Sequence, residues 1–162
     1  MAEELRLPEN GGREENYRAL MPQLKSVLDG EPDYIANLAN TAAVLRQALN
    51  FFWVGFYRML DGELVLGPFQ GDLACTRIPL SRGVCGACAR ERQTIIVPDV
   101  NRFPGHIACS SRSRSEIVVP LVVGGETKLV LDVDSEALDD FGPLDATYLE
   151  QVVDIIKRRH FL

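Results

Sequence analysis

The chain has 162 residues, of which 46% are hydrophobic, and it carries a formal net charge of −6 at pH 7. This length favours a single domain with one core, and the composition is that of an ordinary globular protein rather than a disordered one. The acidic balance argues against nucleic-acid binding, and no apolar run reaches the roughly 20 residues needed to span a bilayer.

The first 13 residues are polar, mixed in charge and without an apolar period. We expect a flexible tail over residues 1–13, followed by one folded domain over residues 14–162. The tail lacks the positive start and apolar stretch of a secretory signal. Because four cysteines occur without such a signal, we expect a reducing, cytoplasmic location, where thiols serve chemistry rather than permanent crosslinks.

Three amphipathic helices are expected along the chain. Apolar residues at helical spacing cover residues 17–28, where Pro22 predicts a kink or a restart. Asp33 is placed to cap a second helix over residues 35–49. A further apolar stripe over residues 148–156 predicts a C-terminal helix.

The middle of the chain has the signature of strands. The segments FFWVGFYRM and ELVLGPF flank Asp61-Gly62, which predicts a hairpin of two antiparallel strands. Shorter strands are expected at residues 76–79, 94–97, 116–123 and 128–134, a short helix at CGACARERQ, and a long connection over residues 99–114. Helices at both ends of such a pattern predict an α+β domain, with a mostly antiparallel central sheet and the N- and C-terminal helices packed on one face.

Two carboxylates are the most unusual feature of the last strand. In LVLDVDS, alternation places Asp132 and Asp134 on one face, about 7 Å apart. Two such acids resist ionising together, so at least one pKa is raised, which suits proton transfer or binding of a cationic group. Glu116 opens the preceding strand and could lie beside them. The alternative is that all three acids are solvated strand ends.

Four cysteines lie in the middle third of the chain. Cys109 lies in the long polar connection, where His106, Arg112 or Arg114 could favour its thiolate. Cys85 is near the start of the short helix, whose dipole also favours a thiolate, and Cys88 follows one turn later. The fourth thiol follows the hairpin, in the segment GDLACTRIP. No single cysteine is distinguished by these patterns alone.

A zinc site is the best alternative to thiol chemistry. Cys85-x2-Cys88 followed by His106-x2-Cys109 offers three thiolates and an imidazole at reasonable zinc spacings. This interpretation leaves Cys75 and the aspartates without a role, and we therefore rank it second.

An aromatic pair lies on the first strand. Trp53 and Tyr57 are four residues apart, so they share a face of the strand. Core packing is the ordinary explanation, but such a wall also suits an apolar methyl-sulfur group or a cation.

Several ordered segments together resemble one enzyme family. They are WVGFY, LVLGPFQG, ACTRIP, RGVCG, VPDV, FPGHIAC, SRSEIVVPL and LDVDS. In this order they are similar to the free methionine-(R)-sulfoxide reductases, which are single GAF-domain enzymes. The match runs from about Asn37 to Asp134, with a looser continuation into the C-terminal helix.

The resemblance implies roles for the thiols. Cys109 matches the catalytic cysteine, whose thiolate attacks the sulfoxide sulfur of free L-methionine-(R)-sulfoxide and becomes a sulfenic acid. Cys75 and Cys85 match the partner cysteines that resolve it as a disulfide, which thioredoxin then reduces. Which disulfide dominates at rest stays open. The resemblance also implies no cofactor or metal, a homodimer and a role in oxidative stress.

The resemblance further implies a substrate pocket. Glu116, Asp132 and Asp134 match acidic residues that can bind the substrate ammonium and help to protonate the sulfoxide oxygen. Trp53 and Tyr57 match the aromatic residues that pack against the substrate.

Two positions depart from the family pattern, and two other functions stay in view. Leu129 stands where the family usually has glycine, and Cys88 stands where a small residue without a thiol is usual; we expect Cys88 to be inert. The other functions are a GAF-type sensory module that binds a ligand without turnover, and an interaction domain stabilised by zinc.

Overall fold

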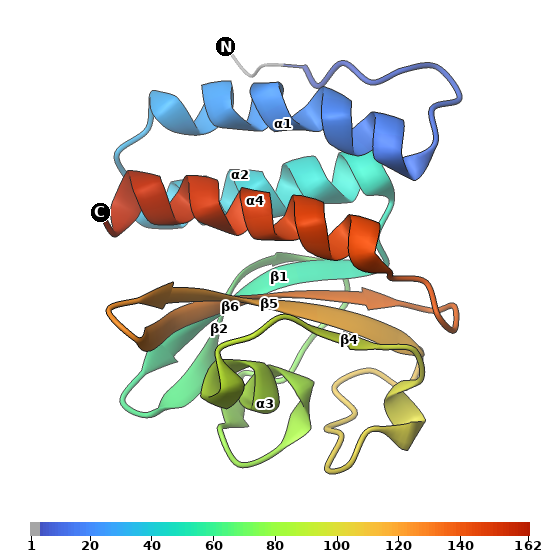
Figure 1. The fold of residues 1–162 in the computed structure, drawn as a ribbon, viewed down its shortest axis with the longest axis vertical. Coiled ribbons are helices and arrows are strands. Elements are labelled where there is room, and N and C mark those ends of the chain that lie inside the picture. Colours follow the sequence, from blue (N-terminus) through green and yellow to red (C-terminus); the bar gives the residue numbers. More distant parts are fainter. Residues whose placement is uncertain (1–3) are drawn as a thin grey trace.

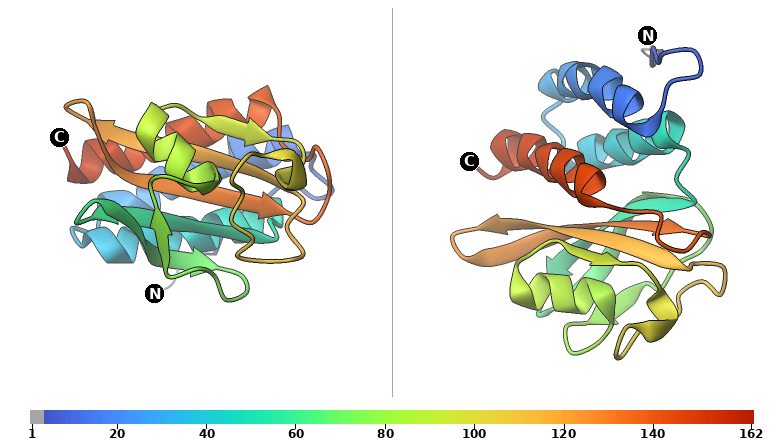
Figure 2. Two further views of the ribbon diagram at one scale, coloured as in Figure 1. Left: turned by 90° about the horizontal axis from the view of Figure 1, so that it is seen from below. Right: turned by 45° about the vertical axis from the view of Figure 1, so that its right-hand side comes forward.

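The structure is a computed structural model that describes residues 4–162 (Figure 1). Two long helices, α2 (Tyr34–Leu49) and α4 (Pro143–His160), lie on one face of a central sheet, and a third, α1 (Arg13–Asp29), packs against their outer side. The opposite face carries the short helix α3 (Gly83–Glu91) and long connections (Figures 1 and 2). Within residues 4–162, no helix combines the length and apolar character needed to cross a membrane.

The sheet has six strands in the order β3-β2-β1-β6-β5-β4, and every neighbouring pair is antiparallel. The strands are β1 (Trp53–Leu60), β2 (Glu63–Gln70), β3 (Arg77–Pro79), β4 (Ile95–Val97), β5 (Ser115–Val123) and β6 (Glu126–Ser135). The predicted hairpin at Asp61-Gly62 joins β1 to β2. The predicted α+β class, antiparallel sheet and packing of the terminal helices on one face are confirmed.

Each face of the sheet has its own hydrophobic core. Leu131 and Val133 of β6 pack under the three long helices, whereas Val130 faces α3 on the other side. This alternation follows from the period-two geometry of a strand. It places Asp132 and Asp134 on the α3 face, which is where the candidate site lies.

Local sequence signals explain the long helices in part. Asp33 caps α2 as predicted, since its side chain accepts a hydrogen bond of 2.8 Å from the Ala36 backbone N–H. Pro22 does not restart α1, which is one continuous helix. Buried Leu20 and Leu24, on either side of the proline, pack into the same core, so tertiary contacts offset the lost backbone hydrogen bond.

Part of the expected tail is attached to the helical layer. Leu5 and Leu7 pack against the core, and the Arg6 backbone N–H donates to Gln23 Oε1 at 2.8 Å. Residues 1–3 lie outside the described residues. The flexible tail over residues 1–13 stays a prediction, and residues 5–7 of it contact the helical layer.

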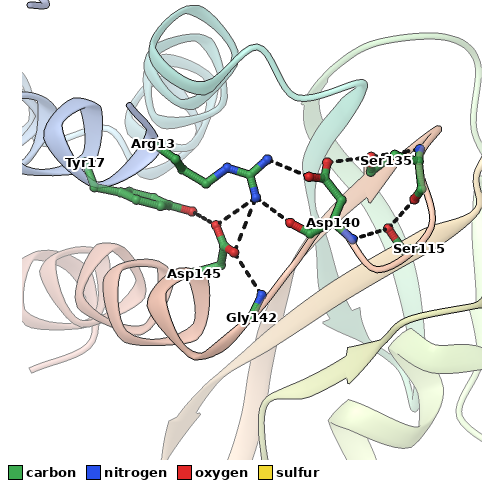
Figure 3. Close-up of polar contacts among 8 residues, drawn as sticks. Arg13, Tyr17, Ser115, Ser135, Asp140, Gly142 and Asp145 are labelled. Atoms are coloured by element: carbon green, nitrogen blue, oxygen red, sulfur yellow. Dashed lines mark hydrogen bonds and ion pairs between the residues drawn. The ribbon is translucent and has the colours of Figure 1, made fainter. Parts of the chain in front are cut away.

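A partly buried polar network joins the start of α1 to the start of α4 (Figure 3). Arg13 forms ion pairs with Asp140 at 2.9 Å and with Asp145 at 3.4 Å. Asp145, which is 3% exposed, also accepts a hydrogen bond from Tyr17 Oη at 2.8 Å and from the Gly142 backbone N–H at 2.9 Å. The last bond satisfies an amide at the N-terminus of α4.

The same network reaches the ends of two strands. Ser135 Oγ donates to Asp140 Oδ2 at 2.6 Å, and the Asp140 backbone N–H donates to Ser115 Oγ at 3.3 Å (Figure 3). Ser115 directly precedes Glu116, and Ser135 directly follows Asp134. The network therefore fixes the strand ends that carry two of the candidate site residues.

Candidate functional site

The sequence-predicted site residues converge on one pocket between the sheet and the connections around α3. Seven of them line it: Trp53, Tyr57, Cys85, Cys109, Glu116, Asp132 and Asp134. The eighth, Cys75, is joined to Cys109 by a disulfide.

Strand pairing brings the three carboxylates together. Glu116 of β5 lies opposite Asp134 of β6, and Val118 lies opposite Asp132. Glu116 and Asp132 are each 6% exposed, so they are not solvated strand ends. Such burial of acids without a basic partner is uncommon and is typical of functional sites.

Burial raises the pKa of all three carboxyl groups. Burial and the neighbouring Asp132 and Asp134 raise the pKa of Glu116 well above its usual value. Burial raises the pKa of Asp132 to about 6, while a hydrogen bond from Glu116 opposes that rise. Burial, then the charge of Asp132, also raises the pKa of Asp134. The arrangement fits a protonated Glu116 that donates to an ionised Asp132.

One further residue that sequence patterns missed completes this group. Ser113 Oγ donates to Asp134 Oδ1 at 2.6 Å. The buried Oδ1 of Asp132, by contrast, has no hydrogen-bond partner. Ser113 lies in an irregular connection, where no periodicity signals which way a side chain points.

The thiols divide into a bonded pair and a buried pair. Cys75 and Cys109 are 34 residues apart in sequence, but their Cα atoms are 5.3 Å apart and their sulfurs are bonded. Cys85 and Cys88 are free and buried. This form of the protein is therefore the oxidised one, with the disulfide joining the β2–β3 connection to the connection before β5.

The expectation that the α3 dipole favours a Cys85 thiolate is wrong. Burial, followed by the charges of Asp132 and Glu116, raises the pKa of the Cys85 thiol well above its usual value. Its Sγ donates to Glu116 Oε1 at 3.9 Å. Desolvation and the neighbouring negative charges both oppose formation of the thiolate.

Cys88 lies apart from this chemistry. Its Sγ donates to the Val118 carbonyl oxygen at 3.6 Å, and the residue is 0% exposed. Leu129, the other departure from the family pattern, is likewise fully buried, in the core beneath the long helices. Both positions serve packing.

The predicted aromatic wall is present and larger than expected. Trp53 and Tyr57 stack with ring centroids 6.1 Å apart, and Phe69 stacks on the other side of Trp53 at 5.3 Å. A Cβ on Gly55 would overlap both Phe69 and Trp53, so this glycine makes room for the stack.

The polar ends of these rings hold the connection that carries Cys75. Trp53 Nε1 donates to the Asp72 carbonyl oxygen at 3.0 Å, and Tyr57 Oη donates to the Cys75 carbonyl oxygen at 2.8 Å. The aromatic pair therefore both lines the pocket and positions one cysteine.

Arg112, which was expected to favour the Cys109 thiolate, has other partners. Its guanidinium pairs with Asp72 at 3.2 Å and Glu136 at 2.6 Å, and it lies 4.8 Å from the centroid of the Phe52 ring. His106 does line the pocket, where burial lowers its pKa and so favours the neutral imidazole.

The zinc set suggested by cysteine spacing is not assembled. Cys109 is committed to the disulfide with Cys75. Among residues 4–162, the one cluster with metal-ligand geometry joins Cys85 to Glu116 and Asp132 instead.

Comparison with known proteins identifies the fold family. The GAF domain pattern matches residues 37–158. The GAF domain-containing protein A of Dictyostelium discoideum is 53% identical over 96% of this chain and 99% of that protein. The chain is thus a GAF domain.

Two further relatives are more specific. The free methionine-R-sulfoxide reductase of Escherichia coli is 46% identical over 86% of this chain and 85% of that one. The structure of free methionine-R-sulfoxide reductase from Neisseria meningitidis in complex with its substrate is 51% identical, with a TM-score of 0.92, and covers 96% of this chain and 95% of that one. The chain belongs to the free methionine-R-sulfoxide reductase family of GAF-domain oxidoreductases.

Proposed function

We propose that this protein reduces free L-methionine-(R)-sulfoxide to methionine, with Cys109 as the nucleophile. The observation that carries the proposal is that the Cys75–Cys109 disulfide, an aromatic wall and three buried carboxylates meet in one pocket. The relative from Neisseria meningitidis, in complex with its substrate, supports the same substrate class.

The buried acids suit the two polar ends of this substrate. Ionised Asp132, with its unpartnered Oδ1, offers a charged acceptor for the ammonium group. Protonated Glu116 offers a proton to the sulfoxide oxygen as that oxygen leaves sulfur. The stacked Trp53 and Tyr57 rings provide an apolar surface for the methyl-sulfur group.

The redox steps use Cys109, Cys75 and an external dithiol. The Cys109 thiolate attacks the sulfoxide sulfur, one proton is taken up, methionine leaves, and the oxygen remains on Cys109 as a sulfenic acid. The Cys75 thiol then displaces water and forms the disulfide, which a dithiol of the thioredoxin class reduces by exchange. Cys85 is the second proposed partner, but its strongly protonated thiol favours Cys75.

A thiol-reducing partner implies a reducing compartment, so we place the protein in the cytoplasm. A role in oxidative stress follows from repair of an oxidised metabolite. Assembly as a homodimer is proposed on the family resemblance.

A thioredoxin-coupled assay tests the activity. We expect turnover of the free R epimer, turnover at background level for Cys109→Ser, and retained activity for Cys88→Ser, which removes a buried thiol outside the pocket. Normal turnover by Cys109→Ser would overturn the proposal. Saturable binding without turnover in the wild type would instead indicate a sensory module.

Substrate form tests the role of the acids. N-acetylation removes the ammonium charge, so we expect kcat/KM to fall by roughly 10²-fold or more, the scale of a lost charge-assisted contact. Equal activity on acetylated or peptide-bound methionine sulfoxide would refute the ammonium contact while leaving the thiol chemistry intact.

A further inference from the structure

A thiol and two carboxylates from three different elements meet at the base of the pocket. Cys85 comes from α3, Glu116 from β5 and Asp132 from β6, and one ligand atom from each lies within 4.8 Å of the others. All three residues are buried and line the pocket. Their grouping depends on the fold, since Cys85 and Asp132 are 47 residues apart in the sequence.

One atom of this cluster lacks a partner. Asp132 is 6% exposed, and its buried Oδ1 accepts no hydrogen bond. An unsatisfied buried acceptor destabilises a protein, and more so when it is charged. Among the described residues, no lysine or arginine lies in the pocket lining to compensate. A bound cation would satisfy this oxygen.

We propose that Cys85, Glu116 and Asp132 form a binding site for one divalent metal ion of the Zn²⁺ class. Thiolate and carboxylate ligands at about 2.3 Å and 2.0–2.2 Å are those that Zn²⁺ accepts, and a set of three leaves a fourth position open toward the pocket. On binding, the Cys85 thiol and the protonated carboxyl group release their protons to solvent.

The neighbouring groups explain why the site has these three ligands. Asp134 Oδ1 is occupied by the Ser113 hydroxyl group, and Cys88 Sγ points to the Val118 carbonyl oxygen. The Cys75 and Cys109 sulfurs are bonded to each other. In the oxidised protein, Cys85 is thus the one free thiol that lines the pocket.

Metal binding has a consequence for the enzyme, which rests on the function proposed above. If Asp132 and Glu116 also hold substrate, then the metal ion and the amino acid exclude each other. Zn²⁺ would inhibit reduction, and L-methionine would displace the ion. The metal site itself requires only the cluster and does not depend on catalysis.

Cobalt(II) is the probe for the direct test, because thiolate ligation gives a charge-transfer absorption in the near ultraviolet. The protein is stripped with a chelator and kept free of reductant, so the Cys75–Cys109 disulfide stays closed and Cys85 and Cys88 are the free thiols. Wild type, Cys85→Ser, Cys88→Ser and Asp132→Asn are titrated, and circular dichroism checks that each is folded.

We expect saturation at one cobalt ion per chain for wild type and Cys88→Ser, loss of the charge-transfer band for Cys85→Ser, and affinity weakened about tenfold or more for Asp132→Asn. No band in wild type, a band retained in Cys85→Ser, or a band lost in Cys88→Ser would each overturn the metal site. A site that binds cobalt but does not release it to L-methionine would support the metal site and refute the shared ammonium contact. Wild-type protein that binds cobalt but does not reduce methionine sulfoxide in the thioredoxin-coupled assay would support the metal site and refute the proposed function.

Discussion

Asp132 shows at the residue scale how a functional group can oppose stability. Its carboxylate is buried beside two other acids, and burial raises its pKa from 3.8 to about 6. The native state therefore favours the protonated form, while the unfolded state ionises at lower pH. Ionisation of Asp132 thus destabilises the fold as pH rises through this interval.

Asp132→Asn tests this conflict. We expect the variant to be inactive but more stable than wild type by roughly 1–3 kcal/mol at about pH 7.5, because the amide removes a buried charge. The gain should shrink as pH falls from about 6 toward 4, because folded wild-type Asp132 is then protonated and the unfolded-state carboxyl group begins to take up its proton near its ordinary pKa of 3.8. Urea unfolding at both pH values measures it, with Asp61→Asn at an exposed turn as the control. A variant less stable than wild type at both pH values would contradict the argument.

At the scale of elements, the two connections that carry Cys75 and Cys109 are joined by more than the disulfide. Arg112, three residues after Cys109, pairs with Asp72, three residues before Cys75. It also pairs with Glu136 and stacks over Phe52. The Arg112–Asp72 ion pair joins the two connections, whereas Glu136 and the Phe52 ring hold the Arg112 side chain in place for it. An exposed ion pair contributes little alone, so we expect the three contacts to act together.

Arg112→Ala should therefore make the disulfide easier to reduce. We expect its equilibrium constant for formation against glutathione to fall about three- to tenfold, with a smaller difference at high salt because the pairs are exposed. The fraction of free thiol across a glutathione series measures this. Arg114→Ala is the matched control, since its exposed guanidinium forms no ion pair within residues 4–162. Equal shifts in both variants would indicate a general charge effect instead.

At the scale of the whole molecule, the Arg13 network joins the first and last helices to the strand ends of the site (Figure 3). Arg13 lies beside the Phe51 and Phe141 rings, at 5.8 Å from each centroid, and pairs with Asp140 and Asp145. Because Asp145 is buried, loss of the arginine leaves its negative charge poorly compensated.

Arg13→Ala should lower the free energy of unfolding by about 1–3 kcal/mol. This is less than the cost of breaking a fully buried ion pair, because the Arg13 side chain is 30% exposed and water screens its charge. Arg18→Ala breaks the exposed pair with Glu14 on the same helix and should leave the free energy of unfolding nearly unchanged. Chemical denaturation of both variants provides the measurement. Similar losses in the two variants would show that the network contributes no more than a surface pair.

The sequence alone determined the features that follow from local periodicity. Alternation in LVLDVDS placed Asp132 and Asp134 on one face, and Asp33 marked the start of α2. Those signals act over a few residues, so the strands, helices and acidic face could be derived without knowing how the chain packs. The roles of the cysteines came from resemblance to a family and not from spacing.

Only the tertiary structure decided which distant groups meet. It paired Cys75 with Cys109, placed Cys85 against Glu116, and directed Arg112 to Asp72 rather than to Cys109. It also overturned the expected Cys85 thiolate, because burial beside carboxylates depends on the fold whereas the helix dipole can be inferred from position in the sequence. Strand register and loop closure set these contacts, and neither is encoded in the local pattern of residues.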